Sequence, residues 1–303
     1  VDYLRDNRDE NMGFLSKTLL PDGTEIPGTN FDYNYLQHRK VDVVSSALDF
    51  ILPFEKYKIT AGAKVSFTNT RNGINYDTSD PTLVQDDYFR YKEQIYALYA
   101  DYSREFSERF SMQLGLRMEH TRTTGISEAK DTEDKHDYTR LFPTVYLLYS
   151  PTDGHALNFS FSNRISRPSQ NMVNPFPFYQ NKYTYACGRE DLKPSYTYNA
   201  ELGYTLKNNF NVSAYYSYSD DVFFQVVDLD AETNVTSFLW ENFMQTHAFG
   251  LNNSYTFRTK WLQAYAQHGV SYRRTTSSAA PTSPEEKGWA YDASLRNTFF
   301  FKE

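Results

Sequence analysis

Four charged side chains are the residues best placed to do chemistry, because each interrupts a segment that otherwise alternates apolar with small polar residues. They are Arg117, Glu119, Arg164 and Glu201. Arginine presents several N–H donors in a fixed fork, and a carboxylate accepts them in pairs. These residues could therefore line a ligand path or pair with one another across neighbouring strands. The sequence leaves both readings open.

Other chemistry-bearing residues give weaker signals. The six histidines form no HExxH motif and no i, i+4 pair. Cys187 is the only cysteine, and the acidic stretches 131–137 and 228–234 lack the spacing of an EF-hand loop. We therefore predict no catalytic residues, no cofactor and no metal site. A hydrolase is the enzyme alternative; it would need a Ser–His–acid set in space, which the sequence alone cannot place.

The elements that must position these charges are extended strands. In residues 155–165 the apolar side chains Leu157, Phe159 and Phe161 alternate with Asn and Ser, and residues 195–206 repeat the alternation with Tyr, Ala and Leu. Strict alternation means strands with one apolar and one polar face. The same pattern predicts eleven strands: 31–52, 57–70, 88–102, 109–123, 138–149, 155–165, 195–206, 210–226, 243–257, 261–274 and 289–301.

The composition indicates whether the apolar faces of the strands contact lipid or a protein core. Mean hydropathy is low at −0.68, yet 17% of the 303 residues are aromatic. Outer-membrane barrels combine an apolar outer band, aromatic girdles and a polar interior in this way. No apolar run is long enough for a transmembrane helix. The net charge of −7 leaves no basic patch for nucleic acid, and the first residues lack a signal-peptide pattern.

The connections between strands are expected to alternate in length. Short turns fall at Pro53, Ser103, Ser150, Lys207 and Arg258, whereas long polar loops are predicted from Arg71, Thr124, Pro168, Asp228 and Thr275. Outer-membrane barrels have short periplasmic turns and long external loops. Residues 1–30 are read as a polar, turn-rich segment that could hold the end of a strand. The fold class is therefore all-β: an antiparallel meander of about 11–12 long strands in a large transmembrane barrel.

A soluble sandwich, lipocalin-like barrel or solenoid is the alternative. In those folds the polar face usually carries many Lys and Glu residues, because water solvates charge readily. Here the polar faces favour Ser, Thr, Asn, Gln and Gly, with few charges. That composition suits a wet barrel interior, so we expect the apolar face to contact lipid. The aromatic run 174–185 is expected to pack its loop rather than stack on a ligand, and Cys187 is expected to have no role.

Several motifs resemble the outer-membrane barrel of TonB-dependent receptors, in the form common in Bacteroidetes. They are FSNRISRPSQNMVNPF, GREDLKPSYTYNAELGY, YKEQIYALYADYS and FSMQLGLRMEHT, and they cover most of residues 88–224. The resemblance implies a barrel of about 22 strands with a plug inside. Relative to that family the chain holds about half of the strands and nothing like a plug. It is therefore expected to be the C-terminal portion of a barrel, one partial domain over residues 1–303.

The resemblance also implies partners and a role. A half barrel has two open strand edges, which must pair with missing strands, with each other or with another copy. The expected partners are outer-membrane lipid, a plug domain, TonB and a surface lipoprotein, with no nucleic acid. The expected role is uptake of a scarce nutrient such as a metal chelate, oligosaccharide or peptide. A passive porin or an adhesin is the alternative.

Overall fold

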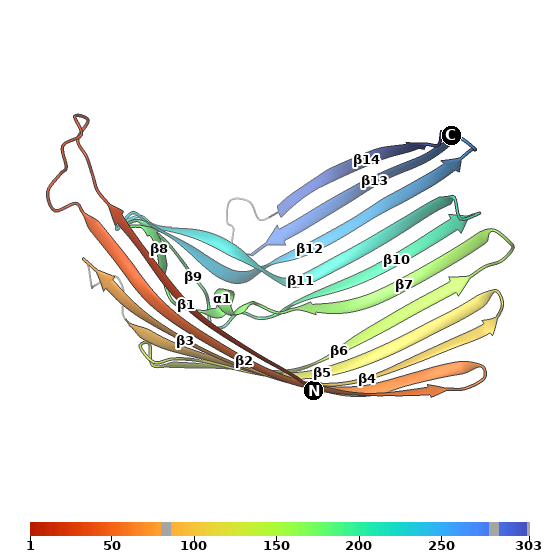
Figure 1. Ribbon diagram of the computed structural model, residues 1–303, viewed down its shortest axis with the longest axis horizontal. Coiled ribbons are helices and arrows are strands. Elements are labelled where there is room, and N and C mark those ends of the chain that lie inside the picture. The colour runs from red at the N-terminus through yellow and green to blue at the C-terminus, as the bar shows by residue number, and fades with distance from the viewer. Residues whose placement is uncertain (80–85, 279–284, 302–303) are drawn as a thin grey trace.

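One curved antiparallel sheet makes up nearly the whole chain in the computed structural model, which describes residues 1–79, 86–278 and 285–301 (Figure 1). Twelve strands follow one another in the order β1-β2-β3-β4-β5-β6-β7-β10-β11-β12-β13-β14, and two short strands, β8 and β9, lie off this path. The predicted meander of 11–12 long strands is confirmed.

The long strands run from 12 to 24 residues. Their bounds are β1 Asp2–Ser16, β2 Phe31–Pro53, β3 Tyr57–Thr78, β4 Asp87–Ser107, β5 Phe110–Ser127, β6 Thr132–Tyr149, β7 His155–Ser166, β10 Ser195–Leu206, β11 Phe210–Asp230, β12 Val235–Arg258, β13 Leu262–Ser277 and β14 Glu285–Phe299. The remaining elements are α1 Gln170–Val173, β8 Phe178–Asn181 and β9 Thr184–Cys187.

Strands extend into four of the five predicted long loops, which corrects the sequence-based expectation, whereas the loop predicted from Pro168 is a long connection. Strand β3 continues to Thr78, and only 128–131 and 231–234 separate β5 from β6 and β11 from β12. Residues 2–16 lie in the polar segment that could hold the end of a strand, and they form β1. Beyond the membrane neither face of a strand contacts lipid. The alternation of apolar and polar residues that marks a strand in the sequence therefore disappears, although the backbone hydrogen bonds between strands continue.

The short turns at the opposite end agree with the prediction. In the three-residue connection 207–209, Lys207 and Asn208 have φ values of 49° and 57°, the left-handed pair at the centre of a type I′ turn. The amide of Lys207 donates to the carbonyl of Gly154, in the neighbouring turn, at 2.6 Å. Gly154 itself has φ of 78°, a conformation that glycine adopts without strain. This bond joins the turn before β7 to the turn between β10 and β11.

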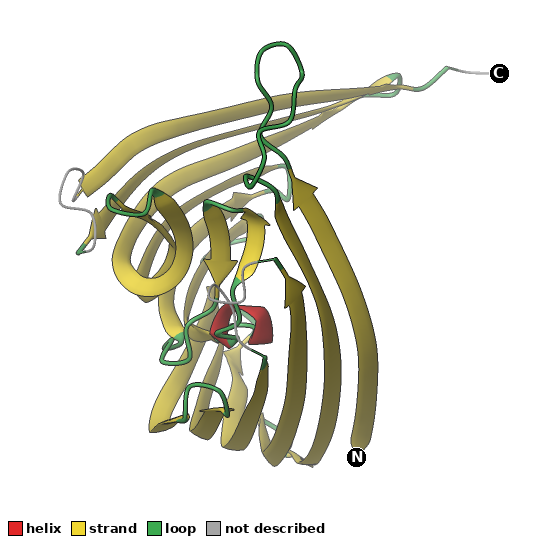
Figure 2. Ribbon diagram, turned by 90° about the vertical axis from the view of Figure 1, so that its left-hand side faces the viewer, coloured by secondary structure: helices red, strands yellow, loops and turns green. Residues whose placement is uncertain are grey.

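The predicted apolar rows lie on the convex face of the sheet. Residues 167–194 occupy the concave side (Figure 2), and side chains such as Tyr33 and Phe89 that pack against this segment are buried. The alternate side chains point away from it. On that convex face Leu48, Leu98 and Leu202 are 59%, 57% and 55% exposed. Such a broad exposed apolar band is what lipid contact requires.

Aromatic side chains border this band at both ends. At the end near the long connections, Phe67 packs edge-on against Tyr96 at 5.8 Å, and Tyr218 lies 4.7 Å from His247. At the short-turn end the pairs are Phe54–Tyr57, Phe106–Phe110 and Trp261–Phe299. Paired girdles at the two interfaces are typical of outer-membrane barrels. They define the membrane-spanning height of the sheet.

The two ends of the strand path each have one neighbour. Strand β1 pairs with β2 and β14 pairs with β13. In the part of the chain that the structure describes, neither end strand has a partner on its other side. Within the same residues, no helix has the length and apolar character needed to cross a membrane.

Candidate functional site in the barrel interior

The interior is organised around a segment that folds back into the barrel. Residues 167–194, which connect β7 to β10, carry α1, β8 and β9 and lie inside the curve of the sheet (Figures 1 and 2). Strand β9 pairs in parallel with β12. Inside the segment, Gly188 and Arg189 donate backbone hydrogen bonds to Asn174 and Met172, both at 2.8 Å. The segment therefore has its own hydrogen-bonded structure. We call it the inner segment.

An aromatic cluster holds the inner segment against the walls of β2, β3 and β4. Tyr33 is fully buried, and its hydroxyl donates to the carbonyl of Pro177 at 2.9 Å; Tyr76 donates to the same carbonyl at 3.2 Å. Burial of large aromatic side chains supplies most of the packing energy here. The buried members of the cluster are Phe31, Tyr33, Tyr35, Ile74, Phe89, Val173, Phe176, Tyr179 and Leu192. The aromatic run 174–185 thus packs the loop, as predicted.

Charged residues anchor the start of the inner segment. Arg167 donates from Nη2 to Oε2 of Glu119 at 2.6 Å and to Oγ1 of Thr121 at 3.2 Å. Arg117 donates to the other carboxylate oxygen of Glu119 and lies over the ring of Tyr99. The Glu119 side chain is only 9% exposed. A carboxylate this buried is stable as an anion only because two guanidinium groups compensate it.

The four predicted residues divide into two pairs. Arg117 and Glu119 face the interior and contact each other. Arg164 and Glu201 face the interior as well but are exposed and lie opposite Thr197 and Ser160. The structure therefore does not bring all four together.

Sequence reasoning missed the partner that completes the charge cluster. Arg167 is not among the four charged residues that the sequence singles out. Its Nε also lies 3.8 Å from a carboxylate oxygen of Glu93. The available signal was a set of isolated acids, Glu93 and Glu119, on inward-facing positions of β4 and β5, because buried acids need a cation.

A cavity of about 470 Å³ lies between the inner segment and the walls of β1, β2 and β12. Arg8 and Arg39, cross-strand neighbours, supply positive charge, whereas Glu10 supplies one acid. The remaining lining is aromatic and polar: Met12, Tyr35, Gln37, Asn171, Phe178, Tyr179, Gln180, Ala186, Cys187, Gly188 and Trp240. Apolar walls with a few convergent charges are characteristic of ligand sites.

Burial changes the titration of two groups in the inner segment. It raises the pKa of the Cys187 thiol, which lines the cavity, although Lys130 opposes the shift slightly. It also raises the pKa of Glu190, against the opposing effect of a hydrogen bond from Thr132. Among the described residues, no group of three His, Cys, Asp or Glu side chains is placed to hold a metal ion.

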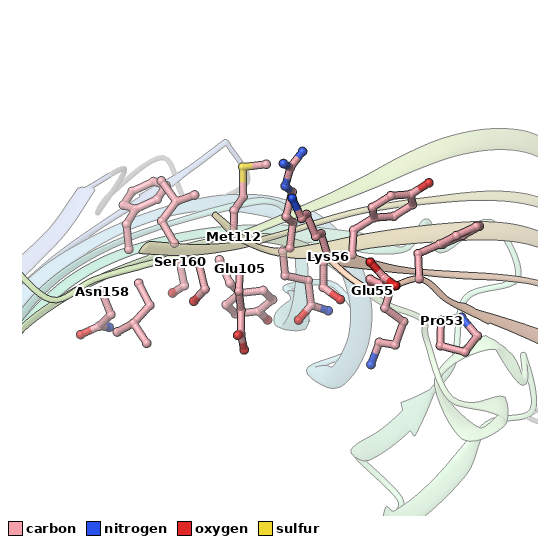
Figure 3. Close-up of a pocket in the computed structure, with 18 residues that line it drawn as sticks. Pro53, Glu55, Lys56, Glu105, Met112, Asn158 and Ser160 are labelled. Atoms are coloured by element: carbon pink, nitrogen blue, oxygen red, sulfur yellow. The ribbon is translucent and has the colours of Figure 1, made fainter. Parts of the chain in front are cut away.

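A second cavity, of about 690 Å³, lies at the short-turn end of the sheet (Figure 3). Its polar lining includes Glu55, Lys56, Gln113, Asn158 and Ser160. In Figure 3 Asn158 and Ser160 point to the opposite side of the sheet from Met112, which faces outward. The wall near the short turns therefore offers hydrogen-bonding groups beside the exposed side chains of Tyr146 and Leu148.

Solved structures share this fold at low sequence identity. A "Copper transporter OprC" aligns with TM-score 0.56 and 12% identity over 97% of this chain and 56% of its own. The ferripyoverdine receptor of the outer membrane of Pseudomonas aeruginosa aligns with TM-score 0.53 and 16% identity over 99% and 41%. The ferric enterobactin receptor (PfeA) aligns with TM-score 0.52 and 12% identity over 99% and 52%. The chain thus spans about half the length of these proteins.

No curated protein sequence matches the chain. The model of one family, described as the outer membrane protein beta-barrel family, matches residues 1–303. The girdled apolar band, the polar interior and the twelve-strand path agree with that match. The chain belongs to the outer membrane protein beta-barrel family and lies in the Gram-negative outer membrane.

Proposed function

We propose that the chain forms barrel wall of a TonB-dependent receptor that imports a scarce nutrient such as a metal chelate, oligosaccharide or peptide. The observation that carries the proposal is the inner segment. It fills part of the barrel interior and walls a charged and aromatic cavity of about 470 Å³ with β1, β2 and β12. A passive porin needs a continuous water-filled lumen, and an anchored segment of this size narrows the interior beside β2, β3 and β4.

The likeness to solved barrels also supports a role in uptake. The three proteins are a copper transporter, a ferripyoverdine receptor and a ferric enterobactin receptor, so each is associated with a metal or a metal chelate. Uptake of a metal chelate is therefore the first member of the proposed class to test. In this function the barrel does no bond-making chemistry and acts by binding and admitting its ligand.

The proposed partners follow from the interior surfaces. A plug domain would contact the polar wall near the periplasmic turns, where Lys56, Gln113 and Asn158 line the second cavity. Arg164 and Glu201, exposed on the same inner face, are the proposed contacts for the plug or the ligand, while Arg117 and Glu119 are occupied with Arg167. TonB would act through the plug. A surface lipoprotein remains a proposed external partner.

Uptake with and without energisation tests this function. The full-length parent protein would be expressed in a Gram-negative host and supplied with ferric citrate, ferric enterobactin, a copper chelate, a maltooligosaccharide or a tripeptide. We expect accumulation of one of these to be lost when TonB is deleted. A passive pore would admit the same solute at an unchanged rate in the deletion strain and would show steady conductance in a planar bilayer. Either result would contradict the proposal.

A further inference from the structure

A polar pair lies within the apolar band on the convex face, where β12 meets β13. The Nδ2 atom of Asn253 donates to Nε2 of His268 at 2.7 Å, and the two residues are register partners. Leu251, two residues from Asn253, is exposed on the same convex face. Gly269, which follows His268, is buried on the opposite face. The pair therefore points toward lipid, away from the barrel interior.

The pair lies deep within the membrane-spanning height of the sheet. At one end of β14, Trp289 packs edge-on against Phe249, and ten residues later Phe299 belongs to the girdle at the short-turn end. Ten residues extend about 33 Å along a strand, or about 23 Å of height at a tilt of about 45°. Ala293, the register partner of His268, is four residues from Trp289, which places it about 9 Å below that level. Both polar side chains are thus at the depth of hydrocarbon.

Each member of the pair keeps a hydrogen-bonding group that no other group among the described residues satisfies. An amide that donates to Nε2 of His268 leaves the ring hydrogen on Nδ1, so the ring presents an N–H donor. Asn253 presents its Oδ1 as an acceptor. The next residues in the same row are the apolar Val212 and Ala293. Hydrocarbon supplies no hydrogen bond, and leaving polar groups unsatisfied in it is unfavourable.

Small side chains surround the pair and leave the surface low. Ala264 and Ala266 of β13 lie on the same face as His268 by the strand period, and Ala293 of β14 lies opposite it. On β5 the outward row is bulky, with Leu114 and Met118 among its members. Inside membranes, small residues allow two backbones to approach closely, and polar side chains then form hydrogen bonds across the contact. This part of the convex face is therefore shaped for contact with another protein surface.

The exposed donor and acceptor complement a second copy of the same pair. Across a two-fold axis, Nδ1–H of His268 in each copy donates to Oδ1 of Asn253 in the other, because the same patch meets itself. A lipid headgroup lies too far from this depth to serve. Strands that pair with the free edge of β14 would lie beside the sheet and leave its outward face uncovered. We propose that two copies of the parent protein associate through the convex face of β12, β13 and β14, around Asn253 and His268.

The strength of association in a bilayer tests the proposal. The full-length protein is labelled with donor or acceptor fluorophores and reconstituted into phospholipid vesicles, and energy transfer is followed as lipid is added to dilute it. The variant is Asn253→Leu with His268→Leu. The matched control is His120→Leu with Thr139→Leu, which removes another histidine-containing pair, joined at 3.0 Å, from the convex face of β5 and β6.

We expect the native protein and the control to form dimers with the same dissociation constant. The variant should dissociate about tenfold more readily, the loss expected for two hydrogen bonds between proteins in a membrane. Its heat-sensitive gel shift should show folding at least as complete as that of the native protein, because leucine is better solvated by lipid. A monomeric native protein at every dilution, an unchanged dissociation constant in the variant, or an equal loss in the control would each overturn the proposal.

Cross-linking locates the contact independently of its strength. In a cysteine-free background that includes Cys187→Ser, Ala266→Cys should be joined into covalent dimers by a short bifunctional maleimide in vesicles. Ala63→Cys is the control, because Ala63 is an outward alanine of β3 that lies between Leu48 and Leu98 and has no polar pair beside it. Cross-linking at position 63 as readily as at position 266 would contradict an interface on β12, β13 and β14.

Discussion

Arg167 and Glu119 join the inner segment to the barrel wall through a hydrogen bond of 2.6 Å between Nη2 and Oε2. Arg167 follows directly after β7, and Glu119 lies in β5, two strands away in the sheet. The carboxylate also receives a bond from Arg117. One ion-paired acid thus fixes the point at which the chain leaves the wall and enters the interior. The structure predicts that this point controls how firmly the inner segment is held.

Arg167→Ala is expected to make local opening of the inner segment easier without unfolding the barrel. Hydrogen bonds to charged groups contribute about 1.5–3 kcal/mol each, and the substitution also leaves Glu119 with one cation instead of two. Local opening should therefore become roughly tenfold or more easier, which backbone hydrogen exchange across residues 170–192 would measure. Exchange in β13, which pairs with β12 and β14 rather than with the inner segment, serves as the internal reference.

A matched variant separates charge from side-chain size at the same position. Arg167→Lys keeps the positive charge but loses the fork of donors, so its effect should fall between those of the native protein and Arg167→Ala. If Arg167→Ala left exchange in the inner segment unchanged, the ion pair would not be its anchor.

Tyr33→Phe and Tyr33→Ala should differ sharply in their effects. The phenylalanine variant loses one hydrogen bond to the carbonyl of Pro177, which Tyr76 still donates to, so we expect a loss of about 1 kcal/mol. The alanine variant removes a fully buried aromatic ring and should lose about 3–5 kcal/mol. The rate of protease cleavage within residues 170–192 of the folded protein would measure the loss in each variant. Similar cleavage rates for the two variants would show that the cluster does not hold the segment.

The reactivity of Cys187 should depend on pH in a predictable direction. Burial raises the pKa of its thiol above the ordinary value of about 8.5. The folded protein should therefore react slowly with N-ethylmaleimide at pH 7, and its rate should still be rising at a pH where denatured protein has levelled off, because the thiolate is the reactive form. Cys187 is the only cysteine, so the assignment is direct. Identical pH profiles for folded and denatured protein would contradict this environment.

Because Gly62 has no side chain, the ring of Tyr99 can lie across it on the inner face of the sheet. A Cβ at this position would lie 2.5 Å from the Tyr99 ring and 2.6 Å from the carbonyl oxygen of Leu48. Gly62→Ala should therefore destabilise the folded barrel by about 1–3 kcal/mol. The denaturant midpoint of the barrel measures the effect, with Gly73→Ala as control, since the nearest atom there is 3.5 Å away. Equal midpoints would indicate that the tyrosine moves aside freely.

The sequence predicted the membrane-spanning part of the fold because lipid imposes a two-residue period on every strand. Rows such as Leu114, Leu116 and Met118 can be read directly, and the structure places all three on the exposed convex face. Outside the membrane the period disappears, which is why β3 and β11 extend beyond their predicted ends. That the chain is one partial domain of a plugged receptor of the Bacteroidetes form stays a prediction.

The sequence predicts which way single charged residues of the site face, but not which of them contact one another. Alternation predicts that Arg117, Glu119, Arg164 and Glu201 lie on the inner face, since facing follows from the strand period, and the contact of Glu119 with Arg167 agrees for that residue. Which charges meet depends on strand register and on the path of residues 167–194 through the interior, and neither has a local sequence signal. The contact between Arg167 and Glu119 joins positions 48 residues apart.

Paired arginine substitutions on the two faces of β5 test the lipid assignment most directly. Leu114 lies on the convex face between the girdles, whereas its neighbour Gln113 lines the interior cavity near the short turns. Leu114→Arg should lower folding into lipid bilayers by about 2–4 kcal/mol, as expected near the midplane, and Gln113→Arg should fold like the native protein. The fraction folded, read from the heat-sensitive gel shift of the barrel, provides the measurement. Equal folding of the two variants would contradict the claim that alternate side chains of these strands face lipid.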